Sequence, residues 1–135
     1  MSFRDSFEDR LAIRELLETY ACAVTMGDAS LLGSVWMEDG IWSLSPERGL
    51  QAQGRDAILA KWNSAMAPIT RMVFTTMLGS LQIDGNTAHC VSFTTETFDN
   101  EGVRHHNLGC YHDVVVKHET RWLFASRTFR SIRRD

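Results

Sequence analysis

The chain has 135 residues, of which 44% are hydrophobic and 23% charged, and this composition is that of a globular protein with one domain, which we expect to span residues 1–135. A formal net charge of −3 argues against a surface made for nucleic acid. No apolar run approaches the ~20 residues that cross a bilayer, and the charged start MSFRDSFEDR is unlike a secretory signal. We therefore expect a cytoplasmic protein with neither a membrane nor a nucleic-acid partner.

The N-terminal part of the chain is predicted to be mainly helical. Apolar residues from Phe7 to Val24 recur at helical spacing, and Gly27 can end this first helix in the left-handed conformation. Asp28 caps a second predicted helix over residues 29–37, and a short strand with Trp42 follows. A polar loop at residues 46–54 then leads into a third helix, which Pro68 closes.

After Pro68 the apolar residues follow the spacing of strands. Four long strands are predicted over residues 70–83, 87–98, 103–118 and 121–132, and the first two flank an Asp-Gly-Asn hairpin. Strands of this length exceed the usual 5 or 6 residues, so the sheet must curl strongly and wrap the helices. The expected fold is α+β, a cone in which three N-terminal helices pack on a strongly curved, mainly antiparallel sheet.

This order of elements resembles the NTF2-like superfamily, and within it the SnoaL-like and scytalone-dehydratase-like branch. The segments that carry the resemblance are RLAIRELLETYA, GDASLLGSVWMEDGIW, GRDAI, IDGNTA, GCYHD and RWLFASRTF, and they span nearly the whole chain. The resemblance implies a cone that encloses a small-molecule pocket. The branch contains lyases that need no cofactor, so we expect none here, and the wider superfamily contains isomerases, cyclases and proteins without catalytic activity.

In the lyases of this branch, a His-Asp pair abstracts a proton, with the Asp near the end of the first helix and the His on the first long strand. The resemblance aligns Thr25 with the Asp and Thr76 with the His. Neither threonine is a general base near neutral pH, so the usual pair is absent. Tyr20 matches a frequent active-site tyrosine of the branch, and Arg127 falls where some of these lyases use an arginine to stabilise charge.

Strand alternation, combined with the resemblance, places Ser92, Thr94, Asn107 and Arg127 on the concave side of the sheet. Without a bulge, Leu123 would share the face of Arg127.

An arginine inside the cone requires a carboxylate partner or an anionic ligand, and we interpret Asp113 as a structural ion-pair partner of a nearby arginine. His105 and His106 are adjacent and point to opposite faces, so only one of them can enter a pocket.

The predicted catalytic residues are Tyr20, His105 and Arg127. The predicted ligand-binding residues are Thr25, Trp42, Thr76, Ser92, Thr94 and Asn107. Trp36, Trp62, Met66 and Phe74 suit a pocket wall and an ordinary core equally well. We expect no metal site, because the three cysteines are widely spaced and no histidine or carboxylate pair has a ligand spacing.

Three functions remain open from the sequence. The first is a cofactor-free lyase or isomerase-type enzyme that acts on a small apolar or aromatic carbonyl compound. The second is a ligand-binding protein without chemistry, and the third is a structural subunit. A homodimer or homotrimer is compatible with all three, because the convex face of the sheet needs cover if its apolar alternates within Val114–Val116 are exposed.

Overall fold

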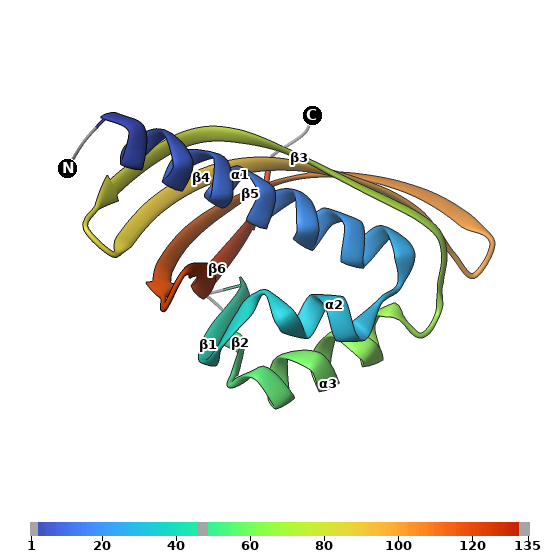
Figure 1. Cartoon of the computed structure of the whole chain (residues 1–135). Helices are drawn as coiled ribbons and strands as arrows, with labels where there is room; N and C mark the ends of the chain where they lie inside the picture. Colours follow the sequence, from blue (N-terminus) through green and yellow to red (C-terminus); the bar gives the residue numbers. More distant parts are fainter. Residues whose placement is uncertain (1–2, 46–48, 133–135) are drawn as a thin grey trace.

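The computed structural model describes residues 3–45 and 49–132 (Figure 1). The elements follow one another along the chain as α1 (Phe3–Met26), α2 (Ala29–Ser34), β1 (Trp36–Ser45), β2 (Leu50–Gln53), α3 (Arg55–Met66), β3 (Ile69–Asp84), β4 (Thr87–Asn100), β5 (Val103–His118) and β6 (Arg121–Ser131).

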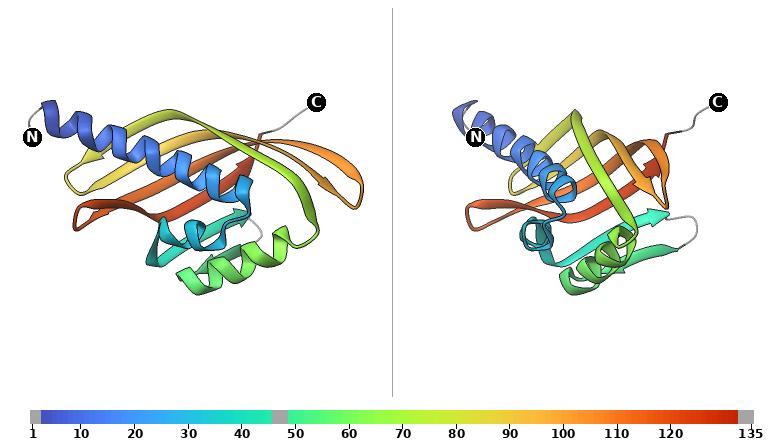
Figure 2. Two further views of the ribbon diagram at one scale, coloured as in Figure 1. Left: turned by 45° about the vertical axis from the view of Figure 1, so that its right-hand side comes forward. Right: turned by 90° about the vertical axis from the view of Figure 1, so that its right-hand side faces the viewer.

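The six strands form one sheet in the order β2-β1-β6-β5-β4-β3. Neighbouring strands are antiparallel except β1 and β6, which run parallel. Strands β3 to β6 are an antiparallel meander, and Figures 1 and 2 show that their length is accommodated by strong curvature. The predicted α+β architecture with a curved, mainly antiparallel sheet is confirmed.

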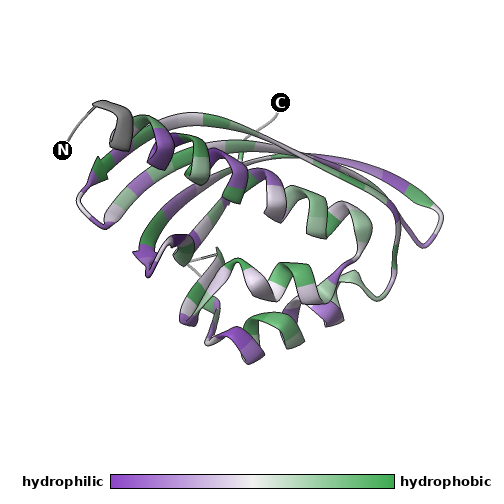
Figure 3. Ribbon diagram, in the orientation of Figure 1, coloured by the Kyte–Doolittle hydropathy of each residue, from purple (hydrophilic) through white to green (hydrophobic). Residues whose placement is uncertain are grey.

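Helix α1 lies across the concave face of the sheet, while α2 and α3 lie near its β1 and β2 edge (Figure 2). The buried side of α1 carries Ile13, Leu17, Tyr20 and Val24, at the spacing of one helix face. Figure 3 shows polar and apolar residues alternating along α1 and the long strands, as expected for elements with one covered face. The core therefore sits between α1 and the concave face.

Two predicted element boundaries were wrong. The second helix ends at Ser34, and Trp36 already begins β1, because this segment pairs with β6 on one side and β2 on the other. The loop predicted at residues 46–54 contains β2, a short strand whose four residues are too few to show a period. Residues 46–48 of that loop lie outside the described residues.

A bulge in β6 changes which residues share the face of Arg127. Val114 pairs with Ser126 but Val115 pairs with Phe124, so Ala125 is the extra residue. Phe124 consequently faces the concave side with Arg127, whose Cζ lies 4.4 Å from the centre of its ring. The expectation that Leu123 shares this face is wrong.

The outer face of the sheet exposes several apolar side chains, among them Met77, Phe93 and Leu108. Met77 and Phe93 are directly opposite each other on β3 and β4. The expected homodimer or homotrimer stays a prediction. Among the described residues, no helix combines the length and apolar character needed to span a membrane.

Candidate functional site

A pocket of about 170 Å³ lies between the helices and the concave face of the sheet. The residues that line it are Tyr20, Val24, Trp42, Leu44, Trp62, Ala65, Met66, Phe74, Glu96, Tyr111 and Phe129. Most of them are aromatic or aliphatic, and the side-chain polar groups belong to two tyrosines, two tryptophans and one glutamate. An apolar pocket with a few polar groups is the usual form of a small-molecule site.

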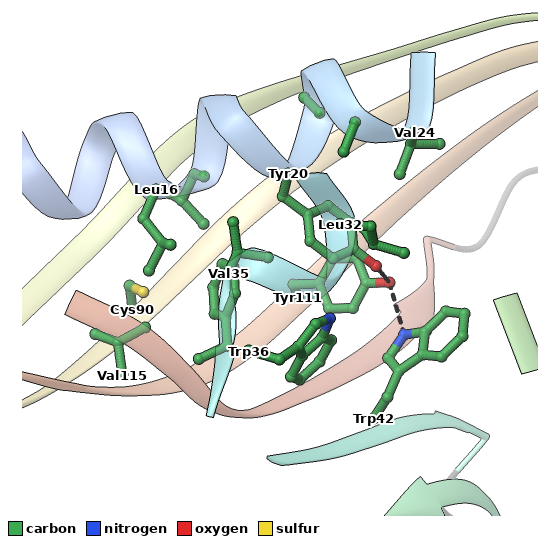
Figure 4. Packing of buried hydrophobic residues seen from close by; sticks show 14 of the residues in the cluster. Leu16, Tyr20, Val24, Leu32, Val35, Trp36, Trp42, Cys90, Tyr111 and Val115 are labelled. Carbon is green, nitrogen blue, oxygen red and sulfur yellow. Dashed lines mark hydrogen bonds between the residues drawn. The ribbon is translucent and has the colours of Figure 1, made fainter. Parts of the chain in front are cut away.

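Three polar side chains from different elements meet at the wall of the pocket (Figure 4). The indole N–H of Trp42, on β1, donates to the hydroxyl of Tyr111, on β5, over 3.1 Å. The hydroxyl of Tyr20, on α1, lies 3.5 Å from that of Tyr111. The two phenols hold two protons, and the contact between them uses one at most, so at least one remains available to a ligand.

Both phenols stay protonated near neutral pH. Burial is the main cause that raises the pKa of Tyr20 well above its ordinary value, and burial likewise raises the pKa of Tyr111. Each hydroxyl is therefore a neutral hydrogen-bond donor on a buried side chain. Donors of this kind stabilise negative charge that develops on a ligand oxygen.

Arg127 lies behind the pocket wall and forms a buried ion pair with a carboxylate. Its Nε donates to Asp113 over 2.8 Å and its Nη2 to the other carboxylate oxygen over 3.1 Å, and Nη2 also contacts the Ser92 hydroxyl at 3.4 Å. Burial is the largest influence on the pKa of Arg127 and lowers it, but the Asp113 carboxylate, together with Tyr111 and Tyr20, leaves the pKa above its ordinary value. The expected ion pair with Asp113 is confirmed.

The guanidinium of Arg127 does not line the pocket, because aromatic rings cover it. Its Cζ lies 3.7 Å from the ring centre of Tyr111 and 4.3 Å from that of Tyr20. The pair with Asp113 thus supports the two phenol rings from behind and offers no free positive charge to a ligand.

Glu96 is the one carboxylate among the described residues of the pocket wall. It lies on β4, directly opposite Phe74 on β3 and Asn107 on β5. Within the part of the chain that the structure describes, its side chain has no hydrogen bond or ion pair. Burial raises the pKa of Glu96 above its ordinary value. Such a carboxylate is a stronger base than an exposed one.

Sequence reasoning missed both Glu96 and Tyr111, although a signal for each was present. Glu96 follows Ser92 and Thr94 at intervals of two on β4, and Tyr111 follows Asn107 in the same way on β5. The alternation that placed the predicted residues on the concave side places these two there as well.

The predicted ligand-binding residues have several different positions. Trp42 lines the pocket, whereas the hydroxyl of Thr25 donates to the Phe74 carbonyl over 3.2 Å and accepts from the Phe74 N–H over 2.9 Å. The buried hydroxyls of Thr76 and Thr94 have no partner among the described residues. Ser92 contacts Arg127, and Asn107 lies beside Glu96 in the sheet without reaching the pocket wall.

His105 is on the concave face but does not line the pocket. It shares a face of β5 with Tyr111, roughly 20 Å further along the strand. Its ring stacks on Phe98 with 5.1 Å between the ring centres. His106 points to the other face, where its Nδ1 lies 3.1 Å from the Thr97 hydroxyl. Of the three predicted catalytic residues, only Tyr20 reaches the pocket.

The described residues that line the pocket include no cysteine. The described residues contain no group of three or more His, Cys, Asp or Glu side chains placed to hold a metal. Cys90 is buried beside Asp113, and burial is the main cause that raises its pKa to about 12. Its thiol therefore stays protonated and is a poor nucleophile.

Comparison with known proteins agrees with this architecture. The sequence profile of the SnoaL-like domain family matches residues 5–128. A candidate scytalone dehydratase structure from Novosphingobium aromaticivorans is 20% identical, with a TM-score of 0.87, over 98% of this chain and 89% of its own. A hexachlorocyclohexane dehydrochlorinase from Novosphingobium barchaimii is 16% identical, with a TM-score of 0.87, over 98% of this chain and 92% of its own.

A ketosteroid isomerase-like protein from Erwinia carotovora atroseptica is 18% identical, with a TM-score of 0.81, over 92% of this chain and 96% of its own. At these identities, the three structures establish the shared fold and nothing finer. No curated protein matches the chain.

Proposed function

The chain belongs to the SnoaL-like domain family, and on that basis we propose that it is a cofactor-free enzyme of the lyase or isomerase type that acts on a small apolar or aromatic carbonyl compound. The observation that carries the proposal is the pair of buried hydroxyls, Tyr20 and Tyr111, at the wall of an apolar pocket that also holds a carboxylate. The similar structures include a candidate scytalone dehydratase, a hexachlorocyclohexane dehydrochlorinase and a ketosteroid isomerase-like protein, whose names suit these two reaction types.

The chemistry follows from where charge develops in such reactions. Removal of a proton next to a carbonyl group moves negative charge onto the carbonyl oxygen, which then becomes a strong hydrogen-bond acceptor. The Tyr20 or Tyr111 hydroxyl can donate to that oxygen, and Trp42 holds the Tyr111 hydroxyl in place. Donors that are fixed before the reaction stabilise the transition state more than the substrate.

A ligand-binding protein without catalytic activity is the second candidate function. It is supported by Thr25 and Thr76, which the resemblance aligns with the usual catalytic pair, and by the bonding of Thr25 to backbone groups of Phe74. The same pocket would then bind and release a ligand without changing it chemically.

The two functions are separated by incubating the protein with a panel of small ketones that carry a leaving group or a double bond two carbons from the carbonyl. Products are followed by NMR, and binding is followed by the rise in melting temperature. The enzyme proposal expects product formation that falls about 10²–10³-fold in Tyr111→Phe, the size of one lost oxyanion donor.

A matched control is Thr19→Val, on the same helix as Tyr20, whose hydroxyl bonds only the carbonyl of Glu15 in the preceding turn. This variant should keep the wild-type rate. Ligands that raise the melting temperature of the wild-type protein but give no product would favour the binding function instead.

A further inference from the structure

We propose that Glu96 is the proton acceptor of this pocket, and that the substrate is a neutral ketone of about one ring in size with a hydrogen on the carbon next to the carbonyl. The inference rests on the proposed function and specifies its base and its substrate class. Three observations carry it: the volume of the pocket, the charges along its wall and the lack of a hydrogen-bond or ion-pair partner for the Glu96 carboxylate among the described residues.

The size of the ligand follows from the volume of about 170 Å³. A protein cavity of about 150 Å³ accommodates benzene, so this pocket holds a single six-membered ring with few substituents. Trp62 and Met66 from α3 and Phe74 from β3 close it with large side chains. A ligand with several fused rings would require these residues to move.

The neutral charge of the ligand follows from the pocket wall. Glu96 is the only residue with a charged form near neutral pH among the described residues that line the pocket. Arg127, which lies behind the pocket wall, is neutralised by Asp113 and covered by the rings of Tyr20 and Tyr111. An anionic ligand would meet a repulsive carboxylate, and no described residue of the wall supplies a cation to balance it.

Glu96 is suited to accept a proton because no described residue holds its carboxylate in a hydrogen bond or an ion pair. The Asp113 carboxylate beneath the pocket is held by Arg127 through two hydrogen bonds and is not available to a ligand. Glu96 has no such partner among the described residues, and it lines the same pocket as both phenols. A ligand of one ring can therefore contact the carboxylate at one carbon and a phenol at its oxygen.

The step balances without an external reactant. Glu96 takes the proton from the carbon next to the carbonyl, the electrons of that C–H bond form the C=C bond of an enolate, and the C=O π electrons move to the oxygen. A tyrosine hydroxyl donates a hydrogen bond to this oxygen. The Glu96 carboxylic acid then returns its proton to the same carbon or to a conjugated one, and the carbonyl re-forms.

The experiment uses cyclohexanone as the probe and follows by NMR the loss of its ring hydrogens next to the carbonyl in D₂O. Wild-type protein should catalyse this exchange, and Glu96→Gln should lower the rate about 10²–10⁴-fold, the usual contribution of a general base. Glu96→Asp should retain part of the activity. Asp99→Asn is the matched control, because Asp99 is another β4 carboxylate and pairs with Arg71 and Arg104 away from the pocket.

A further measurement separates a catalytic role of Glu96 from a structural one. Wild-type exchange should rise with pH as Glu96 ionises, whereas the residual rate of Glu96→Gln should lack this dependence. Melting curves check that every variant is folded.

Different failures overturn different parts of the account. Wild-type exchange that Glu96→Gln leaves intact, or that His105→Gln abolishes while Glu96→Gln does not, overturns the assignment of Glu96 and leaves the proposed function standing. If the wild-type protein catalyses the hydrogen exchange of cyclohexanone no faster than acetate buffer does, this inference is overturned, and the result counts against the proposed enzymatic function as well.

Discussion

Arg127 and Asp113 face each other on the neighbouring strands β6 and β5, and two hydrogen bonds of 2.8 and 3.1 Å join their side chains. The guanidinium lies 3.7 Å from the ring centre of Tyr111, so the ion pair and the pocket share one aromatic wall. The guanidinium of Arg127 thus helps to fix the position of the Tyr111 ring, whose hydroxyl is a neutral hydrogen-bond donor. The Asp113 carboxylate is the counter-charge that the buried guanidinium of Arg127 requires.

Breaking this pair should strongly destabilise the protein. Asp113→Asn leaves the guanidinium of Arg127 buried without its counter-charge, which typically costs about 3–5 kcal/mol in the free energy of unfolding. Urea unfolding measures the change. Asp99→Asn, which disrupts the exposed pairs with Arg71 and Arg104, should cost less than about 1 kcal/mol. Equal losses in the two variants would contradict the structural role of the buried pair.

The two phenols should differ in their contribution to stability. Tyr111→Phe removes the acceptor of the buried Trp42 N–H and should cost about 1–3 kcal/mol. Tyr20→Phe removes only the 3.5 Å contact and should cost below about 1 kcal/mol. Urea unfolding of the two variants, side by side, tests the order. A larger loss in Tyr20→Phe would show that the Trp42 bond matters less than its geometry implies.

Much of the fold could be predicted because long segments repeat their pattern many times. The helix up to Gly27 and the four long strands each show their period over ten or more residues. Strand β2 has four residues and shows none. The bulge at Ala125 leaves no mark in the sequence, yet it decides that Phe124 and Arg127 share a face.

The site was harder to predict, because alternation assigns a face but no position along the strand. Glu96 and His105 both lie on the concave side, but only Glu96 reaches the pocket. That difference depends on where Trp62 and Met66 of α3 close the cavity, which is a matter of tertiary packing. Tyr20 could be found because the resemblance supplied its position as well as its face.

The Thr25 hydroxyl should stabilise the contact between α1 and β3. Its hydroxyl both accepts from the N–H and donates to the carbonyl of Phe74, so Thr25→Val should cost about 1–3 kcal/mol in the free energy of unfolding. Thr19→Val on the same helix should cost less than about 0.5 kcal/mol, because its hydroxyl bonds only a carbonyl of its own helix. Chemical denaturation measures the free energy of unfolding of both variants, and a negligible effect of Thr25→Val would contradict a stabilising role of these two hydrogen bonds.

Glu96 should make stability depend on pH. Burial raises the pKa of Glu96 in the folded protein above its value in the unfolded chain, about 4.3. Between these two pKa values the unfolded chain binds fewer protons, so stability falls as the pH rises through this window, and the deficit persists above it. Glu96→Gln should therefore be more stable than the wild type at pH 7.

This gain in Glu96→Gln should disappear below about pH 4, where glutamate is protonated in both states. Unfolding curves of the two proteins from pH 3 to 8 measure it. A difference that stays constant over this range would show that Glu96 is not buried in its charged form.

The most direct test of the pocket is an NMR titration that follows the four indole N–H signals as cyclohexanone is added. The Trp42 signal should shift and saturate, because its N–H bonds the Tyr111 hydroxyl at the pocket wall, and the Trp62 signal should move with it. The signal of Trp122, whose indole N–H donates to Asp9 over 3.0 Å away from the pocket, should stay in place. Saturable shifts of Trp42 and Trp62 that Tyr111→Phe weakens are the expected result. No shift of Trp42, or equal shifts of all four signals, would contradict a ketone site at Tyr20 and Tyr111.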